Sequence, residues 1–115
     1  MEITNCLKSG PMKNPHNLKA SKLYESDLAE IIHLQLEPGG STVKHITPVD
    51  VVFYILEGEA TITIGDETET VLVENLVKSP KRVPHNISNQ SDTVLRVMVM
   101  KLPKPTEATI IIKEK

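Results

Sequence analysis

The sequence predicts an all-β protein built from short strands, and three observations lead to that prediction. Apolar and polar residues alternate over several segments, which is the period of a strand with one buried face. Glycine and proline turn signals separate these segments at close spacing. No stretch of the 115 residues has convincing helical spacing. The pattern leaves the choice between a barrel and a sandwich open.

Residues 1–73 predict an irregular arm followed by up to five strands. Residues 1–20 contain Gly-Pro and Asn-Pro pairs and no apolar period, so we expect no regular element there. Residues 21–27 are compatible with a short strand and a turn. Residues 32–36 alternate, and 51–56 form a continuous apolar run that predicts a strand buried on both faces. Segments 60–64 and 68–73 flank Gly65-Asp66, which indicates a hairpin.

Residues 75–112 predict four further strands, and the first three end at turn signals. Residues 75–79 precede Pro80, and residues 83–89 precede a polar turn at 90–92. Residues 93–102 form an apolar strand that Pro103 ends. The segment 108–112 predicts a last strand before a charged end.

Composition excludes several functional classes. A formal net charge of -2 gives no electrostatic reason to expect nucleic acid or an anionic membrane as partner. Aromatic residues make up 3% of the chain, too few for a base-stacking platform. No apolar run reaches the length of a membrane span, and the N-terminus lacks the regions of a signal peptide. The single cysteine, Cys6, favours a reducing compartment and is interpreted as a spare thiol, so we expect a cytoplasmic protein.

Two histidines lie in two sets of residues with a defined spacing. The first set is Gly39, His45 and Gly58, and the second is Pro80, His85 and Asn89. These two sets resemble the two motifs of the cupin superfamily, and residues 53–59 are close to the family's usual sequence. The resemblance runs from about residue 30 to residue 105. Each motif alone would be weak, but their combined spacing is fairly specific.

The resemblance implies a cupin-type double-stranded β-helix, which is a jelly-roll-like barrel. Under this prediction residues 1–115 form a single cupin domain. An N-terminal arm occupies residues 1–20, and the core barrel occupies residues 30–105.

The chain departs from both motifs. Thr47 replaces the second histidine of the first motif, and Val51 replaces its glutamate. Asp50 is adjacent, but neighbouring side chains of a strand point to opposite faces, so Asp50 replaces that carboxylate only if a bulge re-aims it. Glu74 and Arg82 stand where the second motif usually has glycine.

Members with the full motifs hold a divalent metal through three histidines and one glutamate, as the resemblance implies. Only His45 and His85 remain here, and two neutral imidazoles lack the negative charge that helps to hold such a cation. We therefore expect no tightly held metal, with a divalent transition metal on these two histidines as the alternative. Met98 and Met100 share a strand face and would suit copper if that face were inward, but core filling is the simpler interpretation.

If the register that the cupin resemblance implies holds, strand parity places eight side chains in one mostly apolar cavity, which is the composition of a small-molecule site. The first hypothesis is therefore a binding module for a small organic ligand. The second is an enzyme, either a metal-dependent oxygenase or isomerase with a reduced histidine set, or a metal-free lyase or isomerase with a histidine base. The third is a structural or partner-binding domain. The expected ligand-binding residues are His45, Thr47, Val51, Phe53, Ile55, His85, Ile87 and Asn89.

The remaining polar residues receive weaker assignments. Arg82 projects a positive charge at the barrel mouth or is a solvated loop residue, and the first case would favour an anionic ligand. His33 shares parity with Gln35 and is expected to face outward. His16 lies in the irregular arm and is expected to carry no chemistry.

One face of the 51–56 strand predicts self-association. Val52, Tyr54 and Leu56 would point away from the cavity. An apolar outer face on a small barrel needs cover, so we expect a homodimer, and the resemblance implies the same.

Overall fold

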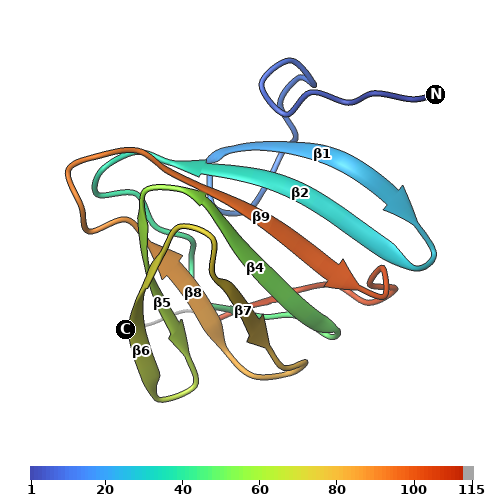
Figure 1. Ribbon diagram of the computed structural model, residues 1–115. Helices are drawn as coiled ribbons and strands as arrows, with labels where there is room; N and C mark the ends of the chain where they lie inside the picture. Colours follow the sequence, from blue (N-terminus) through green and yellow to red (C-terminus); the bar gives the residue numbers. More distant parts are fainter. Residues whose placement is uncertain (113–115) are drawn as a thin grey trace.

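The computed structural model describes residues 1–112. Its strands form two five-stranded antiparallel sheets that lie face to face (Figure 1). Sheet A has the order β1-β2-β9-β4-β7, and sheet B has the order β10-β3-β8-β5-β6. The strands are β1 (Lys19–Ser26), β2 (Ala29–Leu36), β3 (His45–Ile46), β4 (Asp50–Glu57), β5 (Glu59–Ile64), β6 (Glu67–Leu72), β7 (Leu76–Ser79), β8 (His85–Ser88), β9 (Leu95–Leu102) and β10 (Ile110–Ile111).

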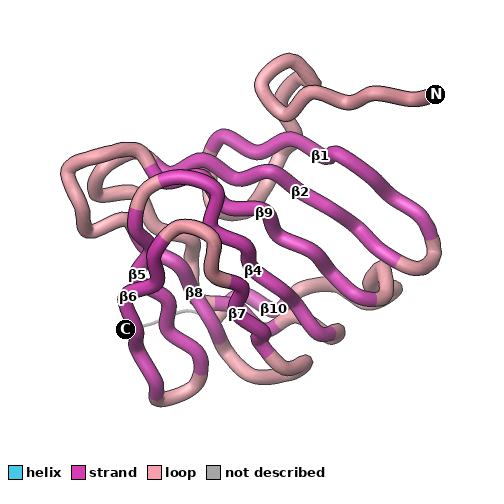
Figure 2. Tube along the Cα trace, in the orientation of Figure 1, coloured by secondary structure: helices cyan, strands magenta, loops and turns pink. Residues whose placement is uncertain are grey.

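The all-β prediction is confirmed. Figure 2 shows strands and loops only, and within residues 1–112 no helix is long and apolar enough to cross a membrane. The strands extend beyond the predicted 30–105 barrel at both ends, because β1 joins sheet A and β10 joins sheet B. The last strand is shorter than the predicted 108–112, since only two residues pair with the two-residue strand β3.

The hydrophobic core fills the space between the two sheets. Alternate residues of each central strand point inward, as in β9, where Leu95 and Val97 are fully buried. The apolar residues of this core, each with an exposure of 8% or less, are Ala20, Ile32, Leu34, Leu36, Val51, Phe53, Ile55, Ala60, Ile62, Ile87, Leu95, Val97 and Val99.

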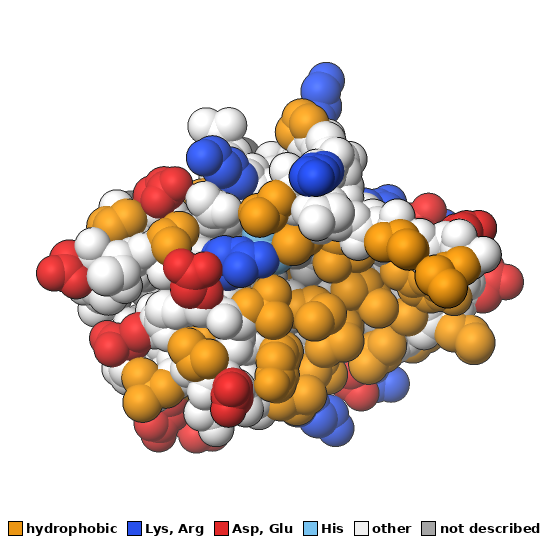
Figure 3. All heavy atoms as spheres, turned by 45° about the horizontal axis from the view of Figure 1, so that its top comes forward, with side chains coloured by type: hydrophobic (Ala, Val, Ile, Leu, Met, Phe, Trp, Pro, Cys, Tyr) orange, Lys and Arg blue, Asp and Glu red, His pale blue; other side chains and the backbone are white. Residues whose placement is uncertain are grey.

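In the single chain the strand β4 is buried on its inner face only. The sequence predicts burial on both faces, with the outer face covered by a second sheet or a second subunit; no second sheet covers it among the described residues, and cover by a second subunit stays a prediction. Val52, Tyr54 and Leu56 are half-buried on the outer side. Met100 pairs with Val52 and Met98 with Tyr54, which continues the apolar surface onto β9. Figure 3 shows this hydrophobic surface over the outer face of sheet A.

Two glycines shape the turns next to β5. Gly65 has a φ of 58°, and it opens the two-residue loop of the β5–β6 hairpin, where Ile64 pairs with Glu67. Glycine at the first central position with positive φ is the requirement of a type II′ turn. Gly58 joins β4 to β5 with a φ of 85°. A Cβ atom there would lie 2.3 Å from the carbonyl oxygen of Val94, so no side chain fits.

Candidate functional site

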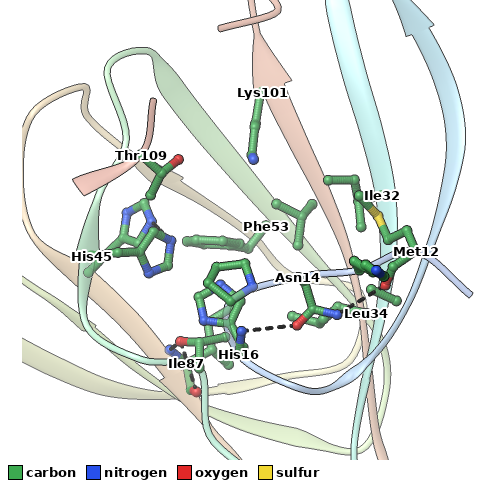
Figure 4. A pocket seen from close by; sticks show the side chains of 16 residues that line it. Met12, Asn14, His16, Ile32, Leu34, His45, Phe53, Ile87, Lys101 and Thr109 are labelled. Carbon is green, nitrogen blue, oxygen red and sulfur yellow. Dashed lines mark hydrogen bonds between the residues drawn. The ribbon is translucent and has the colours of Figure 1, made fainter. Parts of the chain in front are cut away.

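A cavity of about 240 Å³ lies between the sheets and is closed on one side by the N-terminal arm (Figure 4). Its walls are mostly apolar, and its polar groups come from five separate segments of the chain. This composition is that of a small-molecule site. The lining residues that carry the argument below are His16, His45, Phe53, His85, Ile87 and Lys101.

His45 and His85 converge because their strands are neighbours in sheet B. The two residues are direct partners in the antiparallel β3–β8 pair, although forty positions separate them in the sequence. Their ring centroids are 4.4 Å apart with the rings nearly perpendicular, and the two Nε2 atoms are 3.0 Å apart. Phe53 meets His85 edge to face at 5.3 Å. The predicted convergence of these two imidazoles is therefore confirmed.

A directional chain of hydrogen bonds fixes the tautomers of both rings. The Val43 carbonyl lies 2.7 Å from His45 Nδ1 and can only accept, so that nitrogen carries the hydrogen. A neutral His45 then has a lone pair on Nε2, which accepts from His85 Nε2–H. His85 Nδ1 accepts in turn from the hydroxyl of Ser79, 2.6 Å away and fully buried. Every polar atom of the pair has a protein partner.

Burial keeps both imidazoles neutral. The pKa of His85 is lowered to about 3, mainly by desolvation and in smaller part by the nearby His45, Lys101 and His16. The pKa of His45 is also lowered, mainly by burial. These imidazoles act as neutral hydrogen-bonding groups at physiological pH.

The donor set does not fit a tightly held metal. Both Nε2 atoms, the nitrogens that would face a metal, are bonded to each other. Thr47 and Val51 stand where a histidine and a glutamate would complete the set, and Val51 is buried in the core. Within residues 1–112, no three side chains of histidine, cysteine, aspartate or glutamate group closely enough to bind an ion. Two neutral ligands without a carboxylate are a poor site for a divalent cation.

The N-terminal arm brings a third histidine to the cavity, so the expectation that His16 carries no chemistry is not supported by its position. The side-chain oxygen of Asn14 accepts from the backbone amides of His16 and Leu18, both at 3.1 Å, and this turn projects His16 inward. Its ring lies 4.8 Å from that of His45. The backbone amide of Val43 donates to His16 Nδ1 at 3.0 Å, which attaches the arm to sheet B.

Lys101 is another polar cavity residue that the sequence did not indicate. It continues the inward parity of Val97 and Val99 on β9, and Figure 4 shows its side chain extending into the cavity. Its ammonium lies 3.5 Å from the carboxylate of Glu30. The pKa of His16 is lowered to about 4, mainly by burial and in smaller part by His45 and by the charge of Lys101.

Only some of the eight predicted binding residues line this cavity. His45, Phe53, His85 and Ile87 do. Val51, Ile55, Thr47 and Asn89 are buried but lie elsewhere in the core.

Thr47 and Asn89 have different surroundings within that core. The Asn89 amide donates to the carbonyls of Leu36 and Thr93 and therefore ties the loop before β9 to the end of β2. The Thr47 hydroxyl is the one buried side-chain polar atom in the described residues without a hydrogen-bond partner. Such an atom is a place for an ordered water.

The two positions where the motif usually has glycine keep a glycine-like backbone. Glu74 has a φ of 70° and Arg82 a φ of 66°. The Arg82 side chain is mostly exposed and lies 3.8 Å from Glu107, outside the cavity lining, so it is the solvated loop residue of the two alternatives. Asp50 does not replace the missing carboxylate, because its side chain accepts from the backbone amide of Lys81.

The outer face of sheet A carries the two methionines, His33 and the contact of Cys6, and each of these was the subject of an expectation above. Met98 and Met100 lie on this face, so the copper interpretation is wrong. His33 faces the same outer side, as parity predicts, but it is buried rather than exposed. Arg96 donates to His33 and to the thiol of Cys6, at 3.0 and 3.3 Å, beneath the arm. Cys6 thus has a packing partner that its sequence position did not reveal.

Comparison with known proteins agrees with this geometry. The family model described as "Cupin domain" matches residues 32–101. An uncharacterised protein of Methanocaldococcus jannaschii is 32% identical over 85 residues, which is 73% of each chain.

Solved structures show the same fold. A protein of Thermus thermophilus superposes with a TM-score of 0.78 and 27% identity, covering 91% of this chain and all of the other. An RmlC-like cupin of Methanocaldococcus jannaschii with a double-stranded β-helix fold has a TM-score of 0.70 and 27% identity, over 80% of this chain and 85% of the other. A polyketide cyclase of Streptomyces resistomycificus has a TM-score of 0.84 at 18% identity, over 100% and 87%, a likeness of fold alone.

Proposed function

The chain belongs to the cupin family, and from that premise we propose that it binds a small organic ligand between its two sheets without a tightly held metal. One observation carries the proposal. The apolar cavity contains a histidine pair whose metal-facing nitrogens are hydrogen-bonded to each other. A pocket with apolar walls and a few oriented polar groups is the usual form of a site for a small organic molecule.

The test is binding of a compact aromatic probe, 2-naphthamide, to chelator-treated protein by isothermal titration calorimetry. Val99→Phe enlarges a side chain of the cavity wall and is expected to abolish binding. Leu76→Phe makes a similar change at a residue that is 59% exposed, and it should leave binding intact. Urea unfolding of both variants controls for folding. Equal binding by wild type and Val99→Phe, or binding that requires added metal, contradicts the proposal.

Metal-free acid–base catalysis is a second candidate, favoured by the hydrogen-bonded chain from Ser79 through His85 to His45. A general base works best when its pKa lies near the working pH. A pKa of about 3 makes His85 a weak base, so the arrangement suits ligand orientation better. An isomerase or lyase activity that His85→Gln abolishes, with naphthamide binding retained, would establish the catalytic role instead.

We also propose a homodimer formed through the outer face of sheet A. Val52, Tyr54 and Leu56 present half-buried apolar side chains there, and Met98 and Met100 extend the surface. A two-fold interface would bury this surface against its own copy. Sedimentation equilibrium should give twice the 12.8 kDa chain mass, and Tyr54→Glu should reduce it to one chain. A monomeric wild type contradicts the proposal.

A further inference from the structure

We infer that the ligand of this cavity is an organic anion, with a carboxylate or comparable acidic group on a compact apolar body. The inference rests on the proposed function and names the ligand class of the same site. Three features of the cavity lead to it: the direction of its hydrogen bonds, the charge of its walls, and the position of its apolar surface.

The cavity histidines offer a hydrogen-bond donor to a ligand and no acceptor. His16 Nδ1 accepts from Val43, so the hydrogen of the neutral ring lies on Nε2, for which no described residue is a hydrogen-bond acceptor. The lone pairs of His45 and His85 are already used by His85 and Ser79 respectively. A ligand therefore meets the N–H of His16 and must supply the acceptor itself.

The charged groups of the wall are all basic. Among the sixteen lining residues two are lysines, Lys13 and Lys101, and none is an aspartate or glutamate. Lys101 is the less exposed of the two: its side chain is 22% exposed and lies next to Glu30, whereas Lys13 is exposed.

The partner carboxylates do not neutralise the cations around Lys101. Glu30 lies 3.5 Å from Lys101 and 3.6 Å from Lys22, and Glu25 lies 2.9 Å from Lys22 and 3.5 Å from Lys104. Three lysines thus share two glutamates, which leaves one net positive charge in the cluster. A bound anion supplies the missing negative charge, and charge-assisted hydrogen bonds are roughly twice as strong as neutral ones.

The rest of the cavity is apolar and suits the body of such a ligand. The ring of Phe53 and the side chains of Ile87 and Val99 line it from both sheets, and Ile32 and Leu34 add to it from β2. Figure 4 shows His45 to the left of Phe53 and Lys101 above it, with Leu34 and Met12 to the right. The acidic group would face Lys101, and the apolar body would lie toward Leu34 and Met12.

The test compares two probes of nearly equal size that differ in charge, 2-naphthoate and 2-naphthamide, by isothermal titration calorimetry at pH 7.5. We expect naphthoate to bind the wild type about tenfold more tightly than naphthamide, the ratio that one charge-assisted contact provides. Lys101→Met should lower the naphthoate affinity about tenfold and leave the naphthamide affinity unchanged.

Lys22→Met is the matched control. Lys22 contacts the same Glu30 carboxylate at nearly the same distance, but it does not line the cavity. Equal affinity for the two probes, or an equal loss in Lys22→Met and Lys101→Met, overturns the inference and leaves the proposed function standing. If neither probe binds, the proposed function fails and the inference fails with it.

Discussion

Replacing Gly58 by alanine tests how the turn between β4 and β5 is built. A Cβ atom on Gly58 would lie 2.3 Å from the carbonyl oxygen of Val94 and 3.1 Å from Cα of Leu95. Leu95 is the first residue of β9 and Val94 directly precedes it, and β9 is paired with β2 on one side and β4 on the other. They cannot move without disturbing the sheet that carries Phe53.

Gly39→Ala provides the matched reference for this substitution. Gly39 has the same φ of 85°, but a Cβ atom there would have nothing within 4 Å. In both variants, alanine in the left-handed backbone conformation lowers the free energy of unfolding by about 1–2 kcal/mol. Only Gly58→Ala adds steric overlap, for which about 1–3 kcal/mol is typical of overpacked sites. We therefore expect Gly58→Ala to lose about 2 kcal/mol more than Gly39→Ala.

Urea unfolding followed by circular dichroism measures the difference. With a denaturant slope of about 1–3 kcal/mol per molar for a domain of this size, the two midpoints should differ by about 1 M. Equal midpoints for the two variants would refute the steric reasoning, because the backbone term is common to both.

Three other predictions concern the loops and the histidines. Arg82→Gly should raise the free energy of unfolding by about 0.5–1 kcal/mol, because glycine adopts the φ of 66° without strain and only an exposed ion pair is lost. A urea midpoint below that of the wild type would contradict this. Ser79→Ala should cost about 1–3 kcal/mol, because it leaves the buried Nδ1 of His85 unpaired; the same loss in Ser88→Ala, outside this chain of bonds, would refute the assignment. The free energy of unfolding should fall as the pH drops from about 6.5 toward 4. The unfolded chain binds protons at its histidines in this range, whereas folded His85 and His16, with pKa values of about 3 and 4, do not. A His85→Gln variant in which stability depends on pH as in the wild type would contradict this origin.

The strands could be predicted because they depend on local periodicity, and the histidine pair could be predicted because of the motif spacing. Alternation along β8 and β9 places every second side chain inward, and the observed burial follows it. The convergence of His45 and His85 came from motif spacing, and the β3–β8 register places them directly opposite each other.

The rest of the cavity depends on contacts that no local pattern encodes. His16 lies in an aperiodic arm, and its position is set by a hydrogen bond to Val43, twenty-seven residues away. His33 is buried because the same arm covers the outer face of its strand. Lys101 could have been found, since the inward parity of Val97 and Val99 extends to it, but the segment was interpreted as an apolar strand alone.

Parity identifies the side of a sheet but not the depth along a strand. Val51 and Ile55 share the inward face with Phe53, yet only Phe53 reaches the cavity. The others are packed among core side chains above and below it. The predicted site was therefore correct about the face of β4 and too broad along its length.

The most direct test of the central claim is a crystal structure of chelator-treated protein soaked with 6-bromo-2-naphthoate, with anomalous scattering recorded at the bromine edge and above the edges of the first-row transition metals. The account predicts a bromine peak between the two sheets, beside Phe53 and Ile87, and no metal peak at the Nε2 atoms of His45 and His85. A bromine found only outside the barrel, or a metal peak that persists at those two nitrogens, would contradict it.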